Sequence, residues 1–110
     1  MVTVVWGRAH QRAALLAEEL ARFTGELQAL SGVEAAWVFG SALDGDVQAT
    51  SDLGLLVVRV TDEPFLDRSL TLRRELEPRA PVDVFVYTPA ELAEGGRFIR
   101  HALTTGRRLW

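Results

Sequence analysis

The chain contains no cysteine, no lysine and no asparagine, and none of its apolar runs approaches the length of a membrane-spanning helix. Without cysteine there is no disulfide framework, no thiolate nucleophile and no zinc-finger ligand set. The two histidines, His10 and His101, lie far apart in sequence, so oxygen ligands are the expected metal chemistry. The N-terminus also lacks the charged and then apolar layout of a secretory signal, and we therefore expect a cytoplasmic protein.

The composition is that of a globular protein, with 48% hydrophobic and 25% charged residues. At 110 residues the chain is long enough for one hydrophobic core, and we expect residues 1–110 to form a single domain. The formal net charge of −3 gives no general affinity for nucleic acid, so any contact with nucleic acid would have to be local.

The first half of the chain opens with a predicted amphipathic helix over Ala9–Leu30. Met1–Trp6 is rich in β-branched residues and is expected to be an edge strand or a loosely held arm. Gly25 permits a bend or an early end of the helix, and Gly32 suits the left-handed conformation common at a helix terminus. The apolar stripe of the helix comprises Leu16, Leu20, Phe23, Leu27 and Leu30, and the residues off that stripe are Arg12, Glu19, Arg22 and Glu26.

Two predicted buried strands flank a polar segment. Val33–Phe39 is dense in β-branched and aromatic residues, and Gly40 with Ser41 ends it. Backbone N–H groups there, with the Ser41 hydroxyl, would form a seat for a phosphate if a helix begins at this point. Residues 42–50 are expected to be a short helix or a loop over this seat, and Leu53–Val60 is the second strand. The two-residue period of a strand puts Asp52, Gly54 and Leu56 on one face.

The second half of the chain predicts a helix, a third strand and a further helical segment. Thr61 or Asp62 is expected to cap the first helix, with Pro64 in its first turn and an inward face of Phe65, Leu66, Leu70 and Leu76. In the strand Val82–Tyr87, Val82, Val84 and Val86 face one way, and Asp83, Phe85 and Tyr87 face the other. Thr88 caps a helix that has Pro89 in its first turn, is interrupted at Gly95-Gly96 and resumes over Phe98–Leu103; Arg107–Trp110 is a closing strand or a tail.

The spacing of the Gly-Ser pair and the acid resembles the minimal nucleotidyltransferases of the DNA-polymerase-β-like superfamily. Their signature is Gly-Ser, ten residues, then Asp-x-Asp; here Gly40, Ser41 and Asp52 match, and Gly54 stands in the second aspartate's place. The family's third carboxylate lies in a later strand, where Asp83 is the matching residue. The resemblance implies a polymerase-β-like nucleotidyltransferase fold of α/β (α+β) type, with a mixed three- to four-stranded sheet flanked by helices.

The resemblance also implies a chemistry. In the family two Mg²⁺ ions, held by bridging carboxylates, clamp the attacking and leaving oxygens while a nucleotidyl group passes from a nucleoside triphosphate to a hydroxyl. By this correspondence Asp52 and Asp83 are the catalytic and metal-binding residues, and Gly40 and Ser41 bind the phosphate. Glycine at position 54 supplies no ligand, so the transfer, with AMP as the expected group, is weakened or lost, unless Asp46 or a partner residue replaces the ligand.

Simpler interpretations stay open for several of these residues. Asp52 fits a strand cap or a loop acid, and Asp83 fits an edge acid paired with an arginine; Asp44 and Asp46 are most simply loop acids, and Trp37 and Phe39 core residues. The basic side chains near the C-terminus form either a solvated face or a phosphate clamp, and these are Arg97, Arg100, His101, Arg107 and Arg108.

A chain of this size offers little surface for a nucleotide base and an acceptor, so a partner is expected. By resemblance the expected ligand is a nucleoside triphosphate such as ATP, with Mg²⁺ as cofactor. The expected partner is a HEPN-type protein, for which the chain would act as the antitoxin-like subunit of a toxin–antitoxin pair, or a second copy of the chain. The other function class is a non-catalytic scaffold that binds a protein or a nucleotide.

Overall fold

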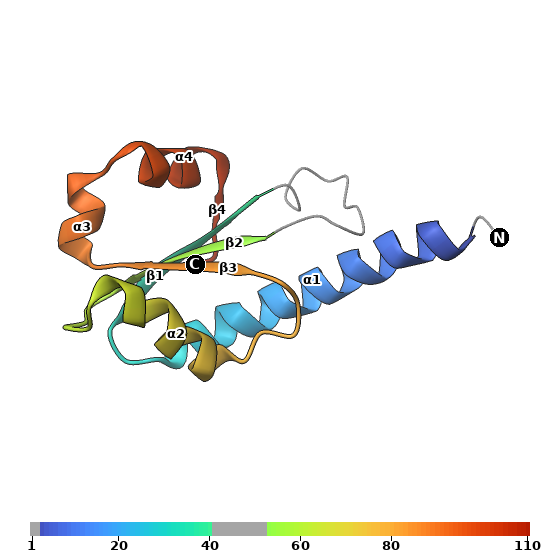
Figure 1. The fold of residues 1–110 in the computed structure, drawn as a ribbon, viewed down its shortest axis with the longest axis horizontal. Coiled ribbons are helices and arrows are strands. Elements are labelled where there is room, and N and C mark those ends of the chain that lie inside the picture. Colours follow the sequence, from blue (N-terminus) through green and yellow to red (C-terminus); the bar gives the residue numbers. More distant parts are fainter. Residues whose placement is uncertain (1–2, 41–52) are drawn as a thin grey trace.

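A computed structural model describes residues 3–40 and 53–110, and the predicted segment 42–50 lies outside these ranges (Figure 1). The described residues form a mixed α/β domain, as the sequence predicts. In chain order its elements are α1 Thr3–Ala29, β1 Val33–Phe39, β2 Gly54–Arg59, α2 Phe65–Leu76, β3 Asp83–Tyr87, α3 Pro89–Glu94, α4 Arg97–Thr105 and β4 Arg107–Arg108.

The strands form one mixed sheet in the order β3-β2-β1-β4. β1 is antiparallel to both β2 and β4, and β2 is parallel to β3. The register pairs Phe39 with Gly54 across β1 and β2, and Gly54 with Asp83 across β2 and β3. The three predicted strands are therefore confirmed, and the expected closing strand is confirmed for Arg107 and Arg108.

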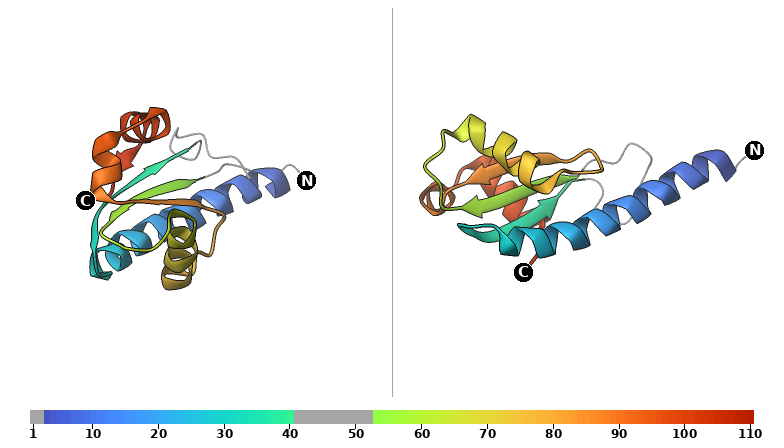
Figure 2. Two further views of the ribbon diagram at one scale, coloured as in Figure 1. Left: turned by 60° about the vertical axis from the view of Figure 1, so that its left-hand side comes forward. Right: turned by 90° about the horizontal axis from the view of Figure 1, so that it is seen from below.

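Helices cover both faces of the sheet, with α1 and α2 on one side and α3 and α4 on the other (Figures 1 and 2). Alternation along the strands divides the core accordingly, because neighbouring side chains point to opposite faces. The α1/α2 side buries Val38, Leu55, Val57, Val84 and Val86 among others. The α3/α4 side buries Ala35, Leu56, Val58, Ile99 and Ala102.

Helix α1 is longer than predicted. The expected edge strand or arm over Met1–Trp6 is wrong for the described residues, since α1 begins at Thr3, continues through Gly25 and ends at Ala29. β-Branched residues lower helix propensity by only a few tenths of a kcal/mol, and extending an existing helix adds one hydrogen bond per residue. The N-terminal part of α1 consequently projects beyond the sheet (Figure 1).

The start and the inward face of α2 also differ from the prediction. Pro64 is the N-cap, without a side-chain cap, and the helix begins at Phe65; the Thr61 hydroxyl instead accepts a hydrogen bond from the Glu63 N–H at 3.1 Å. The buried leucines are Leu72 and Leu76. The predicted inward position is confirmed for Leu76, whereas the other three predicted residues are exposed, at 43% for Phe65, 79% for Leu66 and 54% for Leu70.

The angular positions of these residues around α2 explain why the predicted inward face differs from the observed one. At 3.6 residues per turn, Leu66 and Leu70 lie about 120° and 160° from Leu72, so they cannot face the sheet with it. Phe65 does lie close to the Leu72 direction, but at the exposed end of the helix, where its ring contacts Tyr87 at 5.3 Å between centroids.

Replacement of Leu66 with serine should therefore leave the free energy of unfolding within about 0.5 kcal/mol of wild type, because surface substitutions rarely change it by more. Leu72→Ala is the matched comparison, and its buried side chain predicts a loss of about 3 kcal/mol. Urea unfolding of both variants is the measurement. A loss of more than about 1 kcal/mol in Leu66→Ser would mean that this surface is covered.

The remaining helical predictions are confirmed. Thr88 and Glu91 form a capping box at the start of α3, with the Thr88 hydroxyl accepting from the Glu91 N–H and the Glu91 carboxylate accepting from the Thr88 N–H. Gly95 and Gly96, with φ of 75° and 124°, separate α3 from α4 in a conformation that favours glycine. Across the described ranges, every helix is too short or too polar to cross a membrane.

Candidate functional site

The predicted phosphate seat begins at the end of β1. Gly40 follows Phe39 with a φ of 112°, in the region that favours glycine, so the strand ends where the sequence predicts. Ser41 and Asp52 lie outside the described residues, as do Asp44 and Asp46. The phosphate seat at Gly40 and Ser41, and the metal-binding role of Asp52, accordingly stay predictions.

The third predicted carboxylate lies beside position 54. Asp83 opens β3 as the register partner of Gly54, and its N–H donates to the Leu53 carbonyl at 2.9 Å. Its side chain is exposed, whereas Val82 and Val84 on either side are buried against α1 and α2. The predicted division of this strand into two faces is confirmed, and Asp83 lies on the α3/α4 face, next to the position of the family's second aspartate.

The ring of Phe39 lies over Gly54. These two residues are direct partners across β1 and β2, and a Cβ built on Gly54 would lie closer than 3.0 Å to three carbons of that ring. Glycine in a strand commonly marks such a close approach by another group. The Phe39 ring thus leaves no room for a carboxylate at position 54, a contact that the sequence pattern did not reveal.

Phe39 belongs to an aromatic cluster on this face, which we define as Phe39, Phe85 and Phe98. The ring centroid of Phe39 lies 6.1 Å from that of Phe85 and 5.6 Å from that of Phe98. The centroids of Phe85 and Phe98 are 4.7 Å apart. Tilted and edge-on contacts of this kind add about 1 kcal/mol each beyond area burial. The cluster draws one residue each from β1, β3 and α4 and holds α4 against the face of the sheet that carries Asp83.

This donor set does not fit the two-metal arrangement of the resembled family. Mg²⁺ requires oxygen ligands in near-octahedral geometry, and ring carbons supply none at position 54. Among residues 3–40 and 53–110 no group of three potential metal-ligating side chains comes together. A single Mg²⁺ held jointly by Asp83 and Asp52 remains a prediction, because Asp52 is outside those ranges.

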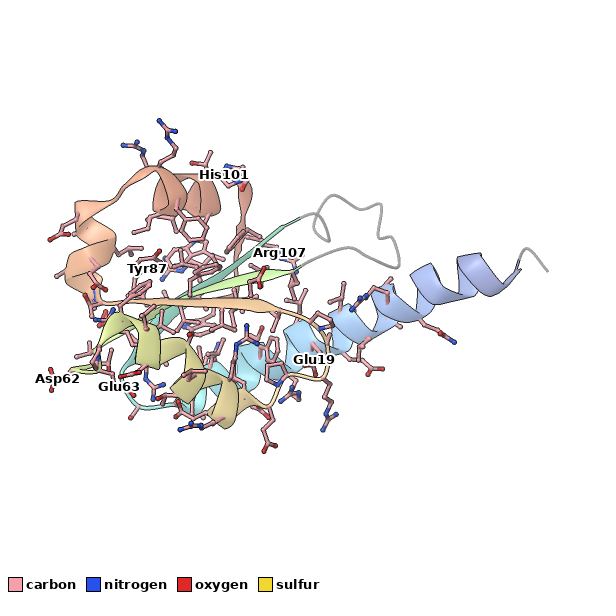
Figure 3. The ribbon with its side chains drawn as sticks, viewed as in Figure 1. Glu19, Asp62, Glu63, Tyr87, His101 and Arg107 are labelled. Carbon is pink, nitrogen blue, oxygen red and sulfur yellow. The ribbon has the colours of Figure 1, made fainter. Side chains whose placement is uncertain are left out.

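The basic residues near the C-terminus lie on α4 and β4. Arg97, Arg100 and His101 are exposed on α4, and His101 is labelled in Figure 3. In β4 the Arg108 guanidinium stacks over Trp37, 5.1 Å from its ring centroid, and its Nε donates to the Trp110 carbonyl at 2.7 Å. The choice between a solvated face and a phosphate clamp stays open for these side chains.

Outside this site, the described side chains include one buried carboxylate, Glu19 on α1 (Figure 3). Although Glu19 lies off the apolar stripe of the helix, its side chain is only 2% exposed. Glu19 pairs with Arg22 at 2.8 Å and accepts the Arg79 N–H at 2.8 Å. Arg22 also donates to the carbonyls of Leu76 and Glu77, so the pair joins α1 to the end of α2.

The ion pair shifts the pKa values of both Glu19 and Arg22. The Arg22 hydrogen bond, assisted by the Arg79 N–H, lowers the pKa of Glu19 against the opposing effect of burial. The pKa of Arg22 is raised, chiefly by the same bond. Near the candidate site, burial and the Glu91 charge raise the pKa of Tyr87. Glu19 and Arg22 each stabilise the charged form of the other, and together they join α1 to the end of α2. Their role is therefore structural.

The described chain is thus a mixed α/β domain in which one carboxylate, Asp83, lies beside an aromatic cluster at one end of the sheet. No family model, curated protein or solved structure matches the sequence or the fold.

Proposed function

We propose that this chain is a nucleotidyltransferase-like subunit with a polymerase-β-like fold, in which metal-dependent nucleotidyl transfer is weakened or lost. Its remaining roles are to bind a nucleoside triphosphate such as ATP and to bind a partner protein. The proposed partner is a HEPN-type protein, for which this chain acts as the antitoxin-like subunit. Support comes from the Gly40-Ser41 and Asp52 spacing, together with the placement of Asp83 beside position 54.

The observation that carries the proposal is the Phe39 ring over Gly54. Two-metal transfer needs a carboxylate that bridges both ions, and here an apolar ring occupies the space that its side chain would need. Binding of a nucleotide makes a smaller demand, because backbone N–H groups and a hydroxyl can hold phosphates without a second metal. The arrangement therefore favours binding over catalysis.

An enzymatic role is the second candidate, and the exposed Asp83 favours it. One carboxylate on the correct face could still orient a Mg²⁺ that arrives with the triphosphate, since Mg²⁺ commonly takes several ligands from phosphates and water. The group transferred would be AMP, and the acceptor a hydroxyl of a protein or a small molecule. In this case a residue of the partner or Asp46 would supply the missing ligand.

Calorimetric titration of ATP with and without Mg²⁺ tests the binding role. We expect weak, Mg²⁺-dependent binding by the wild type, which Ser41→Ala removes and Asp83→Asn weakens. Asp62→Asn is the matched control, because Asp62 is likewise an exposed acid but precedes α2 rather than opening β3. Wild-type protein that binds no ATP at millimolar concentration would refute the nucleotide seat, and equal effects of the two aspartate variants would refute the role of Asp83.

A transfer assay with labelled ATP separates the two candidate functions. The assay combines the chain with the protein encoded by the neighbouring gene and follows the label on either protein. Label transfer that Asp83→Asn abolishes would establish the enzymatic role. A stable complex of the two proteins without any label transfer is the result that we expect.

A further inference from the structure

The two edges of the sheet are treated differently by the surrounding chain. On the β3 edge, arginines of α2 bind the outward-facing carbonyls: Arg73 Nη2 donates to Val82 at 2.6 Å, and Arg68 Nη1 donates to Val86 at 3.4 Å. Such bonds occupy backbone groups that an additional strand would need. The β3 edge is therefore partly closed to a further strand.

The other edge strand is β4, which among the described residues pairs with β1 and with no second strand. Arg107 and Arg108 pair with Val38 and Trp37, and the Leu109 N–H donates to the Ala36 carbonyl at 2.9 Å. In an antiparallel ladder, alternate residues direct their backbone groups toward the partner strand. The N–H and carbonyl of Arg108 consequently face away from β1, on the outer edge of the sheet.

An open groove of about 500 Å³ lies beside this edge, between α1 and β4. Figure 2 shows the C-terminal end of the chain emerging next to α1. Three of the four α1 residues that line the groove, Ala17, Ala21 and Thr24, have small side chains, which leaves room for another backbone to approach. The described lining residues are Ala17, Leu20, Ala21, Thr24, Arg107, Arg108 and Leu109, and none of them is acidic.

Positive charge is concentrated in the C-terminal segment of the chain, which forms the β4 side of this groove. Fifteen acids and eight arginines precede Gly95, whereas four arginines and no acid follow Glu94. All four, Arg97, Arg100, Arg107 and Arg108, are exposed and make no ion pair in the part of the chain that the structure describes. An anionic occupant is therefore favoured at this edge and opposed by the rest of the surface.

From these observations we infer that β4 and the α1–β4 groove bind an extended, acidic segment of a partner protein by strand addition. The segment pairs with the outer backbone groups of Arg108, and its alternate carboxylates point to the α1 face of the sheet, where they reach Arg107. Main-chain hydrogen bonds supply part of the affinity, and the arginines select for acidic side chains. The inference rests on the proposed function for the existence of a partner, and its site is separate from the face that carries Asp83.

The test selects peptides from a displayed random library on the wild-type protein, without nucleotide. We expect selected peptides with acids at every second position, as a strand requires. The strongest peptide is then synthesised, both unchanged and with alternate backbone amides N-methylated. Methylation preserves the side chains but blocks strand pairing, so it should weaken binding at least about tenfold, since each 1.4 kcal/mol of lost hydrogen bonding is a factor of ten.

Three protein variants locate the binding site. Arg107→Glu reverses the charge at the groove, and Ala21→Phe fills the groove from α1 without changing the charge. Each variant should weaken peptide binding at least about tenfold. Arg100→Glu is the charge-matched control on α4 and should weaken it by less, about threefold, because Arg100 is outside the groove lining. Circular dichroism of each variant checks that the fold is retained.

Several outcomes would overturn the inference. Peptides without acids, equal binding of the methylated peptide, or equal losses in Arg107→Glu and Arg100→Glu would each do so. A single-stranded RNA that binds more tightly than the peptide and is displaced by it would assign the surface to nucleic acid, and a dimer that Ala21→Phe abolishes would assign it to a second copy of the chain. Failure of ATP binding, or of complex formation with the protein encoded by the neighbouring gene, would refute the proposed function and leave these peptide results unaffected.

Discussion

Glu19→Ala is expected to lower the free energy of unfolding by about 3 kcal/mol, because it leaves a partly buried arginine without its main partner. The lost contacts are the ion pair with Arg22 at 2.8 Å and the bond from the Arg79 N–H at 2.8 Å. Arg22 is 20% exposed, so water recovers part of the loss and the estimate stays at the lower end of the range for buried pairs. Urea unfolding at neutral pH is the measurement.

Glu26→Ala provides a matched control. Glu26 pairs with the same arginine at 2.9 Å, but its side chain is 45% exposed. An exposed pair four residues apart on a helix contributes about 0.3–0.5 kcal/mol, so this variant should remain close to wild type. Equal losses in the two variants would contradict the argument from burial.

The same contact predicts an acid dependence of stability. The Arg22 bond lowers the pKa of Glu19 in the folded state below its ordinary value of 4.5, so the contribution of Glu19 is fully present above pH 4.5 and disappears as the pH falls through the folded value. The difference between wild type and Glu19→Gln should therefore be constant near neutral pH and shrink in acid. If the difference in stability grew below pH 4.5, the pKa of Glu19 would be raised in the folded state, and the predicted lowering would be wrong.

Gly54→Asp is expected to destabilise the protein by about 2 kcal/mol and to give no gain in Mg²⁺ affinity, because inserting atoms into a filled space forces the neighbours to move. The sequence alone predicts a gain of Mg²⁺ affinity, provided that apolar side chains do not fill the space around position 54, and a stability that changes little or falls slightly. The Phe39 ring fills that space, because it would lie closer than 3.0 Å to the new Cβ, so the condition is not met. Urea unfolding and Mg²⁺ titration at neutral pH measure the two effects.

A second substitution tests the cause. Phe39→Val keeps an apolar residue that favours strands but removes the ring, so the double variant Phe39→Val/Gly54→Asp should be more stable than the sum of the two single changes predicts, by about 1 kcal/mol. Mg²⁺ affinity should appear only in the double variant, where the carboxylate can point toward Asp83. Additive effects on stability would mean that the ring does not obstruct position 54.

Periodicity in the sequence was sufficient for much of the fold. The β-branched runs Val33–Phe39 and Val82–Tyr87 correctly indicated strands, because strands of this kind are apolar and bounded by turn residues. The Thr88-Pro89 start of α3 was equally predictable, since the capping residue, the proline and Glu91 all satisfy local rules. These features depend on residues within a few positions of one another.

The features that the sequence did not predict depend on residues far apart in the chain. Glu19 lies off the apolar stripe of α1, and its burial depends on contacts with Arg79 and with the α2 terminus through Arg22. The contact of Phe39 with Gly54 depends on the register of β1 and β2, which a sequence does not state. An aromatic residue that ends one strand and a glycine that begins the next were the available signal.

The fit of Phe39 against Gly54 constrains the order in which this protein could change during evolution. A lineage that acquired aspartate at position 54 first would pass through an unstable intermediate, whereas one that first lost the ring at position 39 would not meet this clash. The two positions are therefore epistatic, and a change at one decides which residues selection can accept at the other. A carboxylate could therefore be accepted at position 54 only after a change at position 39.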